Sequence, residues 1–397
     1  MSAKDFKIGL ETDFLNGALT GVGNYCIHLV EAMMERDATF QFQAFSSLVW
    51  RPLARGDLRK MKEAPQQSEN ISQSAKISRD IRSVLARNEM ARVAYRRVIA
   101  ARFRRSSAAK SLDLFHAFRF VPPADIDTPV LPVVYDLSFA RYPNAHPKQR
   151  IRELSRLGDV IEKAAFVQTI SRFSKREIAA VYDCSPGKIV VAPPAASEIY
   201  RPLGDDVTRL DLLPFGLAAR QYLLAVGTLE PRKNLKTLIA AYSQLSPNAR
   251  NSFPLAIVGN KGWGNLDLPR AAGQMIQEGS LRFLGSVPDA QLRSLYEGAI
   301  ALMFPSVYEG FGMPAVEALA CGTQVAHSSG TSMDEITDEN SLRVTAMDVD
   351  AWTIVMQRLL DDRAAATTGR AARRARSQIF SWAQSAETIL RVYAQLS

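Results

Sequence analysis

The first half of the chain alternates short apolar runs with stretches of helical periodicity. Residues 6–12 (FKIGLET) are apolar enough for a buried strand, and a glycine-containing loop over 13–23 follows them. A helical segment comes next, and its apolar face is made by Cys26, Leu29, Val30 and Met33. Further apolar runs of strand length lie at 112–118, 128–137, 164–171 and 188–194. This alternation predicts the parallel sheet of an α/β domain.

A second series of apolar runs begins after a stretch at 203–217 that breaks the periodicity. Its runs lie at 222–227, 255–259, 281–285, 299–306 and 323–328, with room for a helix between one run and the next. We therefore expect two Rossmann-like domains, residues 1–205 and 216–377. The closing segment, 378–397, predicts an amphipathic helix that could pack on either domain, including by crossing back to the first.

The composition is typical of a folded protein and excludes several classes. The chain has 397 residues, of which 47% are hydrophobic and 22% charged. It has neither an apolar run of roughly 18 residues that could span a membrane nor a secretory leader, so we expect it in the cytoplasm. Cys26, Cys184 and Cys321 are too widely spaced to predict a disulfide framework or a metal site.

The net charge of +9 is concentrated in one segment, residues 76–110, which holds eleven Lys or Arg and only two acids. Apolar residues recur there at helical spacing: Ile77, Ile81, Val84, Leu85, Val93, Ala94, Val98 and Ala101. This pattern predicts a basic amphipathic helix on an anionic membrane surface. The alternative is a soluble helix that packs this stripe on the first sheet. We expect no nucleic-acid partner, because aromatic residues are few and no recognition motif is present.

The sharpest local feature is SVYEGFGMPAVEALACG at 306–322. Glu309 lies in a glycine-flanked loop after a strand, and a short helix follows. Gly310 and Gly312 have no side chain, so backbone N–H groups at the helix start can approach a phosphate. Glu317 would present a carboxylate suited to two ribose hydroxyls, with Glu309 on the sugar side. The alternative is that Glu317 only favours the positive helix end and Glu309 is a solvated loop acid.

A second feature is VGTLEPRKN at 226–234, where a strand ends and Arg232 and Lys233 stand together at the start of a predicted helix. Cations in a first helical turn oppose the helix dipole, so a dianionic ligand between them would explain the pair. The alternative is an exposed Arg-Lys pair without a ligand.

A third, weaker feature is GALTGVGNY at 17–25. Gly21 and Gly23 lie between the first strand and the first helix, where α/β folds bind phosphates. The full GxGxxG pattern is absent, because Cys26 occupies the position of the third glycine.

In combination, these motifs resemble glycosyltransferase family 4: EGFGMPAVEALACG with its Glu-x7-Glu spacing, GTLEPRKN, TGVGNY, VVYDLS, TISRFSKREI and GSVPDAQLRSLYEGA. The match spans nearly the whole chain and is similar to the bacterial branch that builds mannose- or rhamnose-containing surface polysaccharides. The resemblance implies an α/β fold of the GT-B type, two facing Rossmann-like domains with a deep cleft between them. The nucleotide-sugar donor would bind the C-terminal domain, and the acceptor would bind largely the N-terminal one.

The resemblance also implies roles for single residues. Arg232 and Lys233 would stabilise the diphosphate leaving group, Glu317 would hold the ribose, and Glu309 would bind hydroxyls of the donor sugar. The implied donor-binding set is completed by Gly21, Gly23, Gly227, Phe311, Gly312 and Met313.

Two further candidates depart from the family pattern. Asp136 matches the acid of the family's His-Asp pair, but Tyr135 stands where the family has histidine. His116 lies where the family often has a histidine facing the cleft, but Phe118 replaces the second histidine of many members. His116 is therefore either a catalytic residue or a buried core residue.

The activity implied is that of a retaining hexosyltransferase without metal or cofactor, since fixed cations and helix N-termini can stabilise the leaving diphosphate. We expect mannose from GDP-mannose, moved to a glycan or lipid-linked acceptor in lipopolysaccharide or cell-surface polysaccharide synthesis, at the inner face of the plasma membrane. The alternatives are a dTDP-rhamnose- or UDP-sugar-dependent transferase and a GT-B nucleotide-sugar epimerase. A covalent route would need a carboxylate beside the anomeric carbon, and the sequence places none.

Overall fold

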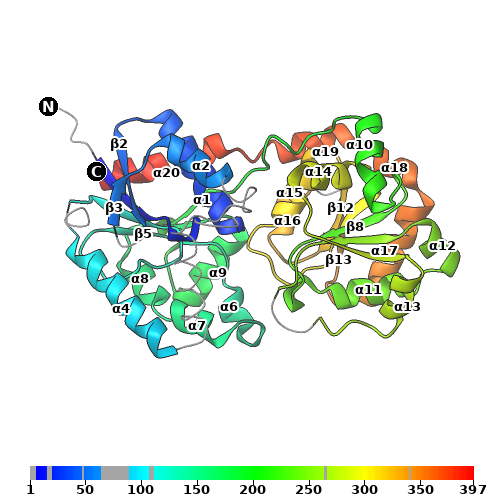
Figure 1. The fold of residues 1–397 in the computed structure, drawn as a ribbon, viewed down its shortest axis with the longest axis horizontal. Coiled ribbons are helices and arrows are strands. Elements are labelled where there is room, and N and C mark those ends of the chain that lie inside the picture. Colours follow the sequence, from blue (N-terminus) through cyan, green and yellow to red (C-terminus); the bar gives the residue numbers. More distant parts are fainter. Residues whose placement is uncertain are drawn as a thin grey trace.

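Two α/β domains lie side by side in the computed structural model, each with a sheet between layers of helices (Figure 1). The structure describes residues 6–15, 20–46, 49–63, 89–106, 111–262, 266–338 and 341–397. Two parts of the predicted basic segment, residues 76–88 and 107–110, lie outside the described residues.

The strands of the N-terminal domain are β1 (Phe6–Glu11), β2 (Phe40–Ser46), β3 (Val49–Pro52), β4 (Leu114–Ala117), β5 (Val130–Val134), β6 (Val167–Thr169) and β7 (Ile189–Val191). Its helices are α1 (Gly21–Arg36), α2 (Arg55–Glu63), α4 (Glu89–Arg105), α6 (Ser138–Arg141), α7 (Lys148–Leu154), α8 (Leu157–Lys163) and α9 (Arg172–Tyr182). The strands of the C-terminal domain are β8 (Leu223–Val226), β9 (Leu255–Val258), β10 (Leu281–Gly285), β11 (Ala301–Phe304), β12 (Gln324–Ser328) and β13 (Leu342–Val344). The remaining helices are α10 (Asp205–Leu212), α11 (Leu235–Ser243), α12 (Pro247–Ser252), α13 (Ala271–Gln277), α14 (Asp289–Gly298), α15 (Met313–Ala320), α16 (Met333–Ile336), α17 (Val349–Asp361), α18 (Arg363–Thr367), α19 (Arg370–Ser377) and α20 (Trp382–Leu396).

Both sheets have the strand order of a doubly wound fold. Within the described residues the first sheet runs β3-β2-β1-β4-β5-β6-β7 and the second β10-β9-β8-β11-β12-β13. Neighbouring strands are parallel, except that β3 pairs antiparallel with β2. In each sheet the first strand along the chain lies inside the order, so the winding direction reverses beside it. The predicted fold class, two Rossmann-like domains, is confirmed.

The predicted strands follow from burial on both faces. Ten strands fall within the apolar runs identified in the sequence, because a parallel strand covered by helices on both sides is apolar along its length. Three strands were not predicted. β2 alternates polar and apolar residues, while β3 and β13 are short edge strands of four and three residues.

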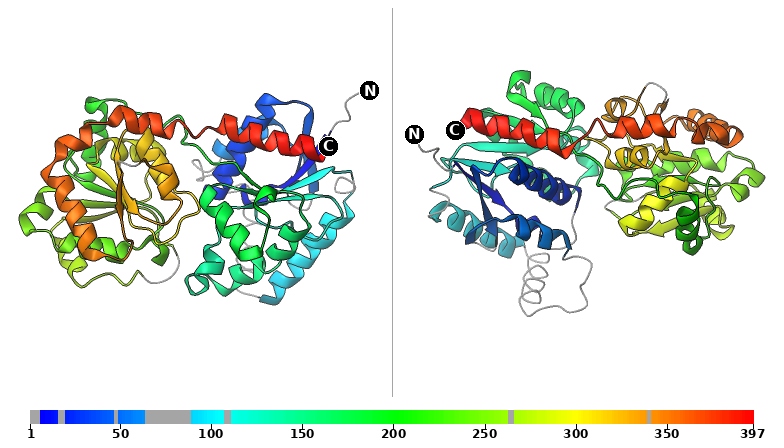
Figure 2. Two further views of the ribbon diagram at one scale, coloured as in Figure 1. Left: turned by 180° about the vertical axis from the view of Figure 1, so that it is seen from behind. Right: turned by 90° about the horizontal axis from the view of Figure 1, so that it is seen from above.

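The chain crosses between the domains twice. After β7 it enters the C-terminal domain, where α10 packs against α14. After α19, which packs against α15, it returns, and α20 packs against α1 and β7 of the N-terminal domain. Figure 2 shows α20 lying along the N-terminal domain beside the blue elements. The closing helix is therefore part of the N-terminal domain's core, although it is last in sequence.

Helix α20 is anchored by a buried polar contact as well as by apolar packing. His116 of β4 is fully buried, and its Nδ1 atom lies 2.6 Å from Oη of Tyr393, in a hydrogen bond that spans 277 residues of sequence. At the start of α20, the ring of Trp382 stacks on His28 of α1, with ring centroids 5.2 Å apart. Because a buried polar group without a partner is costly, the His116–Tyr393 bond should contribute to holding α20 in place.

Helix α4 covers the other face of the N-terminal sheet. Its Phe103 is fully buried and contacts the rings of Phe45 and Phe115, with ring centroids 5.1 Å away in each case. Ile99 and Ala100 pack on the same cluster, whereas Val98 is 53% exposed. The helix thus packs on the sheet through Phe103 and not through the stripe that includes Val98, which argues against the alternative of a soluble helix that buries this stripe.

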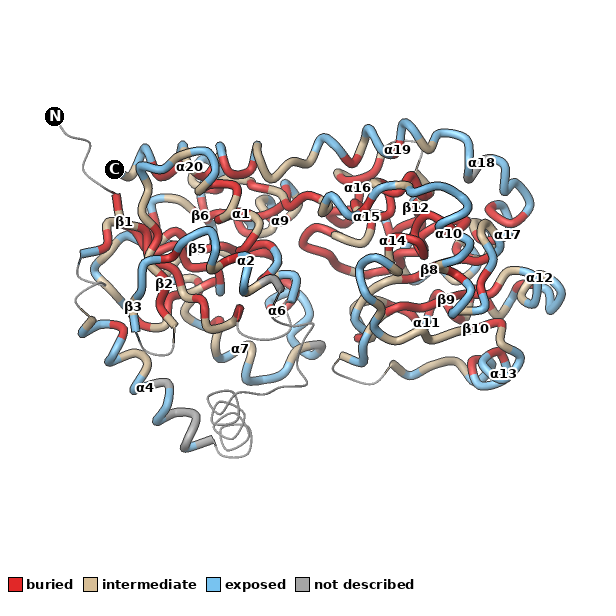
Figure 3. Tube along the Cα trace, turned by 45° about the horizontal axis from the view of Figure 1, so that its top comes forward, coloured by how far each residue is buried: buried red, intermediate tan, exposed pale blue. Residues whose placement is uncertain are grey.

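Burial in the molecule follows these layers. The strands of both sheets are buried, and the outer helices expose their solvent side (Figure 3). In the described part of the chain, no helix combines the length and the apolar character that crossing a membrane requires.

We predict that Tyr393→Phe lowers the free energy of unfolding by about 1–3 kcal/mol, because it leaves a buried His116 nitrogen without its partner. Urea denaturation of the wild type, Tyr393→Phe, His116→Phe and the double variant would measure the coupling between the two side chains. Tyr95→Phe on the partly exposed face of α4 is a matched control, with an expected change within about 0.5 kcal/mol. Additive losses in the double variant would contradict the anchoring role.

Candidate functional site

The candidate site lies at the carboxyl ends of two neighbouring parallel strands. β8 and β11 are adjacent in the second sheet, and the chain winds outward in opposite directions from them. Ligands of open α/β sheets bind at such reversal points, beyond the carboxyl ends of the strands. The loop after β8 carries Arg232 and Lys233, and the loop after β11 carries Glu309. The fold therefore brings together residues that are 76 positions apart in sequence.

The turn after β8 is built to present the two cations. Arg232 and Lys233 lie in a separate 3-10 turn, Pro231–Lys233, and α11 begins only after Asn234. The predicted placement in the first turn of a helix is therefore wrong. Asn234 adopts left-handed geometry with φ 54°, and its side chain donates to the carbonyls of Pro305 (3.1 Å) and Ala346 (2.7 Å). This side chain ties the cationic turn to the end of β11.

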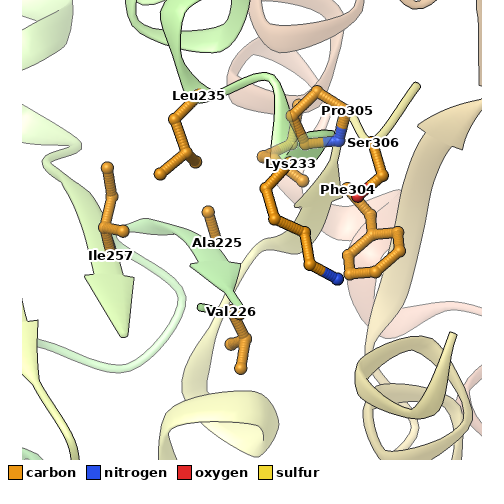
Figure 4. Close-up of a pocket in the computed structure, with 10 residues that line it drawn as sticks. Ala225, Val226, Lys233, Leu235, Ile257, Phe304, Pro305 and Ser306 are labelled. Atoms are coloured by element: carbon orange, nitrogen blue, oxygen red, sulfur yellow. The ribbon is translucent and has the colours of Figure 1, made fainter. Parts of the chain in front are cut away.

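Gly227 makes room for Lys233. Its φ of 150° is strained for other residues, and a Cβ atom there would lie 3.3 Å from Cε of Lys233. The ammonium group of Lys233 lies 5.1 Å from the centre of the Phe304 ring (Figure 4). A pocket of about 10 Å³, room for about one water molecule, lies beside Lys233 among the ends of β8, β9 and β11.

Four charged side chains form a largely buried cluster here. Glu309 accepts from both cations, with Oε1 2.6 Å from Nζ of Lys233 and Oε2 3.0 Å from Nη1 of Arg232. Glu230 pairs with Arg232 through a single oxygen, Oε1, which lies 2.7 Å from Nη2 and 3.1 Å from Nε. Two acids and two bases make the cluster formally neutral. Buried charges persist when they are paired in this way, and removal of one partner is costly.

The surroundings within the cluster shift the pKa values of Glu309, Arg232 and Glu230. Burial by itself would raise the pKa of Glu309, but the charges of Arg232 and Lys233 outweigh it and lower that pKa to about 2. Burial tends to lower the pKa of Arg232, yet attraction to Glu309, Asp136 and Glu230 raises it overall. Burial raises the pKa of Glu230 against the effect of the two cations. Glu309 and Arg232 therefore stay charged at neutral pH.

The Glu309 loop leads into α15 through a close backbone approach. Gly312 precedes the helix with φ 119°, and a Cβ atom there would lie 2.3 Å from Sδ of Met333. The buried hydroxyl of Ser332 lies 2.9 Å from the carbonyl oxygen of Glu309 and 2.6 Å from that of Phe311, and it holds the loop in shape. Pro314 has no N–H group, and the N–H groups of Ala315 and Val316 donate to the carbonyl oxygen of Gly312. An anion at this helix start would therefore meet the N–H of Met313 and those of the preceding loop, where the helix dipole favours it.

Glu317 lies on α15, one turn beyond its start, and is half-buried. Tyr296 donates a hydrogen bond to its Oε2 atom at 2.9 Å. Burial raises the pKa of Glu317 to about 7, opposed by the hydrogen bond from Tyr296 and reinforced by the charge of Asp289. This carboxyl is held in place by one donor and is poorly solvated, so it would gain from further hydroxyl donors.

In the N-terminal domain, the candidate residues Gly21 and Gly23 lie on α1, and the candidate Asp136 lies after β5. Gly21 and Gly23 lie in the first turn of α1, not in the loop before it, and a Cβ atom on Gly21 would meet nothing within 4 Å. The preceding residues, 16–19, lie outside the described residues. Asp136 follows β5, and its Oδ1 atom accepts from the backbone N–H (3.0 Å) and hydroxyl (2.7 Å) of Ser138.

The structure places His116 away from the charged cluster. It stacks on Phe118, with ring centroids 4.0 Å apart, and bonds to Tyr393 of α20. Burial lowers its pKa to about 3, so the ring is uncharged at neutral pH. Of the two interpretations left open by the sequence, this geometry favours the core histidine, because the ring is fully buried and contacts Phe118 and Tyr393.

Several residues of the site were not found from the sequence. Glu230 stands inside the GTLEPRKN motif but gave no signal, because only its contact with Arg232 shows its role. Ser332 lies in a different loop, after β12. His146 and Arg150 also lie near Asp136: burial lowers the pKa of both side chains, and the charge of Asp136 offsets part of this lowering. In the described part of the chain, no three His, Cys, Asp or Glu side chains gather as a metal site would require.

This fold and site define a class. The most similar solved structures include sucrose-phosphate synthase from Thermosynechococcus elongatus (TM-score 0.69, 19% identity, 98% of this chain and 99% of that one). They also include Anabaena HepE in complex with UDP and glucose (TM-score 0.68, 16% identity, 98% and 100%). A third is WaaG, a glycosyltransferase involved in lipopolysaccharide biosynthesis (TM-score 0.65, 14% identity, 97% and 99%). The chain has the GT-B glycosyltransferase fold.

Sequence comparison carries the identification further. Residues 217–378 match the family model of glycosyl transferases group 1. The chain is 29% identical over 391 residues to O-antigen chain mannosyltransferase B of Escherichia coli, covering 98% of this chain and 100% of the relative. It is 27% identical over 238 residues to the serotype-specific mannosyltransferase WbdA of Escherichia coli, which covers 59% of this chain and 29% of that protein. The chain is a hexosyltransferase, and its similarity to the group 1 glycosyl transferases covers residues 217–378 in the C-terminal domain.

We predict opposite pH effects of Glu317 and Glu309 on stability. Between pH 4.5 and about 7 the folded protein keeps a proton on Glu317 that the unfolded chain has lost, so stability falls as pH rises. Relative to Glu317→Gln, the wild type should lose on the order of 3 kcal/mol of unfolding free energy over this window. Glu309 has a lowered pKa, so its stabilisation is present above pH 4.5 and is lost as pH falls toward 2.

Urea denaturation of the wild type, Glu317→Gln and Glu309→Gln at a series of pH values would measure both differences. Slopes of the same sign for the two variants would show that the assigned surroundings of these carboxyls are wrong.

Proposed function

We propose that the chain is a retaining transferase that moves a mannosyl residue from GDP-mannose to a glycan or lipid-linked acceptor in lipopolysaccharide or other cell-surface polysaccharide synthesis. The observation that carries the proposal is the cluster of Arg232, Lys233 and Glu309 at the reversal point of the second sheet. The similarity to O-antigen chain mannosyltransferase B over nearly the full length supports the choice of mannose.

The charges of the cluster suit a diphosphate leaving group. Transfer breaks the bond between the anomeric carbon and the phosphate oxygen, and negative charge builds on that oxygen. Arg232 and Lys233 are fixed in place by Glu230, Glu309 and the Tyr308 carbonyl, so they can stabilise this charge without first reorganising. These cations would replace a metal ion in this role, and we expect chelators to leave the activity unchanged.

The donor would lie along the loop and helix after β11. Glu317 would accept the ribose hydroxyls, and the amides around Phe311, Gly312 and Met313 would face the phosphates and sugar. Glu309 would bind sugar hydroxyls while it holds the cations. The acceptor hydroxyl attacks the anomeric carbon from the same face, and its proton passes to the departing phosphate oxygen. Asp136, with His146 and Arg150 nearby, would line the acceptor side.

The exposed face of α4 supports a membrane-bound acceptor. Met90, Ala94, Val98 and Ala101 recur at spacings of four, four and three, so they share one face, opposite Phe103. Met90 is 83% exposed and Val98 53%. Exposed arginines flank this stripe: Arg97, Arg102, Arg104 and Arg105. An apolar stripe between arginines suits the interface of an anionic membrane, where each basic residue contributes about 1 kcal/mol.

We predict that GDP stabilises the wild type by about 2–3 kcal/mol at 100 times its dissociation constant, seen as a rise in melting temperature of a few degrees. UDP, dTDP and ADP should give smaller shifts. The double variant Arg232→Ala/Lys233→Ala should lose the GDP shift, and its kcat for mannosyl transfer should fall by about 100-fold or more. Lys236→Ala is a matched control, because Lys236 lies on the next turn but pairs with exposed Asp267.

A larger shift with UDP or dTDP would replace GDP-mannose by a UDP-sugar or by dTDP-rhamnose as the donor. Sugar-nucleotide turnover without acceptor and with a changed sugar would favour an epimerase over a transferase. No shift with any nucleotide would contradict the proposed function itself.

We predict that the protein sediments with vesicles that contain anionic lipid, and that about 0.5 M salt releases it because salt screens the attraction. Arg97→Gln/Arg104→Gln/Arg105→Gln should reduce the bound fraction by about tenfold or more. The triple variant Arg209→Gln/Arg358→Gln/Arg374→Gln removes the same charge from exposed positions of the C-terminal half and should bind like the wild type. Equal losses in both variants would show that total charge, and not α4, governs binding.

A further inference from the structure

Contacts between the two domains converge on one small region, the start of α9 and the segment after β5. Among the described residues, the hydrogen bonds from the C-terminal domain to this region come from the loop that carries Glu309 and from helix α16. The loop that carries Glu309 belongs to the proposed catalytic site. The same loop therefore also contacts the N-terminal domain.

Tyr308, directly before Glu309, inserts its ring into the N-terminal domain. The ring lies edge-on to Tyr142 and Phe173, with centroid distances of 5.8 and 5.3 Å. Its Oη atom accepts a hydrogen bond from the backbone N–H of Leu137 at 3.1 Å, and the residue is buried. The carbonyl oxygen of Tyr308 also accepts from Nη1 of Arg232 at 2.7 Å. One residue thus joins the N-terminal domain to the charged cluster.

Gly310, directly after Glu309, lies against the backbone of the other domain. A Cβ atom on Gly310 would lie 2.3 Å from the carbonyl oxygen of Tyr135 and 2.8 Å from Cβ of Asp136, both in the N-terminal domain. Gly310 is not among the residues with positive φ, so its own backbone would accept alanine. Ser174 adds a bond across the interface, because its hydroxyl lies 3.1 Å from the carbonyl oxygens of both Gly310 and Tyr135. Only the approach of the second domain requires glycine at position 310.

Glu335 of α16 caps a helix of the other domain. Ser171 caps α9 from within by accepting from Ser174 N–H, but the N–H groups of Arg172 and Phe173 also need acceptors. Both donate to Glu335, with Oε2 3.0 Å from Arg172 N and Oε1 3.0 Å from Phe173 N. A carboxylate at this end also complements the helix dipole. The two oxygens fit only while the domains are together.

The same elements reach the segment where the chain crosses back to the first domain. Arg376, on α19, donates to the carbonyl oxygens of Glu335 (2.7 Å) and Ile336 (2.9 Å). Phe380, between α19 and α20, packs edge-on against Phe311, with ring centroids 5.3 Å apart. Movement of the crossing segment would therefore move α16 and the Glu309 loop together.

We propose that Tyr308, Gly310 and Glu335 form a closure latch, a set of positioning residues that couples docking of the two domains to the placement of Glu309. The proposal rests on the proposed transferase function, in which donor and acceptor must enter between the domains and product must leave. When the latch is closed, Tyr308 and Gly310 hold both sides of Glu309 against the acceptor domain. When it opens, the α9 N–H groups and Glu335 return to water, and Glu309 stays with its cations.

The sharpest test is Gly310→Ala, because its methyl group clashes only in the docked arrangement. Glu335→Ala removes the cap, Glu335→Gln keeps one acceptor oxygen, and Tyr308→Phe removes only the bond to Leu137. Asp334→Asn is the matched control, since this acid lies on the same helix but accepts from Gly330 within its own domain. Small-angle X-ray scattering would report domain separation, calorimetry would report GDP affinity, and steady-state assays would give kcat and KM with GDP-mannose.

We expect larger radii of gyration for Gly310→Ala and Glu335→Ala than for the wild type. Their kcat should fall by about tenfold or more. Their GDP affinity should change less than about threefold, because Arg232 and Lys233, which would bind the diphosphate, are unchanged. Glu335→Gln and Tyr308→Phe should retain part of the rate, and Asp334→Asn should match the wild type. Wild-type scattering and wild-type kcat in both Gly310→Ala and Glu335→Ala would overturn the latch.

The two proposals fail in different ways. If the wild type transfers no mannose, the proposed function is wrong, but scattering still compares the domain separation of wild type and variants. If Gly310→Ala does not fold, the two Glu335 variants and Tyr308→Phe still decide the question. Equal losses of kcat and GDP affinity in Glu335→Ala would indicate general damage to the fold and would overturn the positioning role.

Discussion

The arrangement of the site depends on the neutralisation of Arg232 and Lys233 by Glu309. Two cations buried side by side repel each other and lose hydration, so they stay together only if carboxylates share the space. Glu309 bonds to both, and Glu230 orients Arg232 from the other side. This pairing joins the loop after β8 to the loop after β11, and with them the two strands between which the sheet reverses its winding. The strand order, the left-handed backbone of Asn234 and the close packing at Gly312 all hold the two loops in the positions that this contact requires.

The loop that carries Glu309 also contacts the N-terminal domain. Tyr308 and Gly310 flank Glu309 and contact the N-terminal domain on either side of it, and Glu335 caps α9 close by. Within one short loop, the residues that hold the charges and those that join the domains alternate. Domain docking and charge placement are therefore mechanically linked. The crossing segment before α20 belongs to this system through Phe380 and Arg376.

The N-terminal domain combines three surfaces. One face of its sheet is covered by α1 and α20, and the His116–Tyr393 hydrogen bond joins α20 to strand β4. The other face is closed by α4 through Phe103, which leaves an apolar and arginine-rich stripe of that helix outside. The third surface, around Asp136 and α9, meets the C-terminal domain.

Much of the protein was determined by the sequence itself. Apolar runs predicted ten strands and two Rossmann-like domains, because a parallel strand covered on both faces must be apolar along its length. Glycines beside Glu309 and the pair Arg232–Lys233 predicted an anion-binding site at these strand ends, and the structure brings Glu309 and the two cations together there. The tertiary structure decided what depends on distant partners. It placed His116 in the core with Tyr393, buried Phe103 in preference to Val98, and gave Glu230, Ser332, Tyr308 and Glu335 their contacts. These residues carry no local pattern, because their roles follow from hydrogen bonds and charges across loops and domains that only the folded chain brings within about 3 Å of one another.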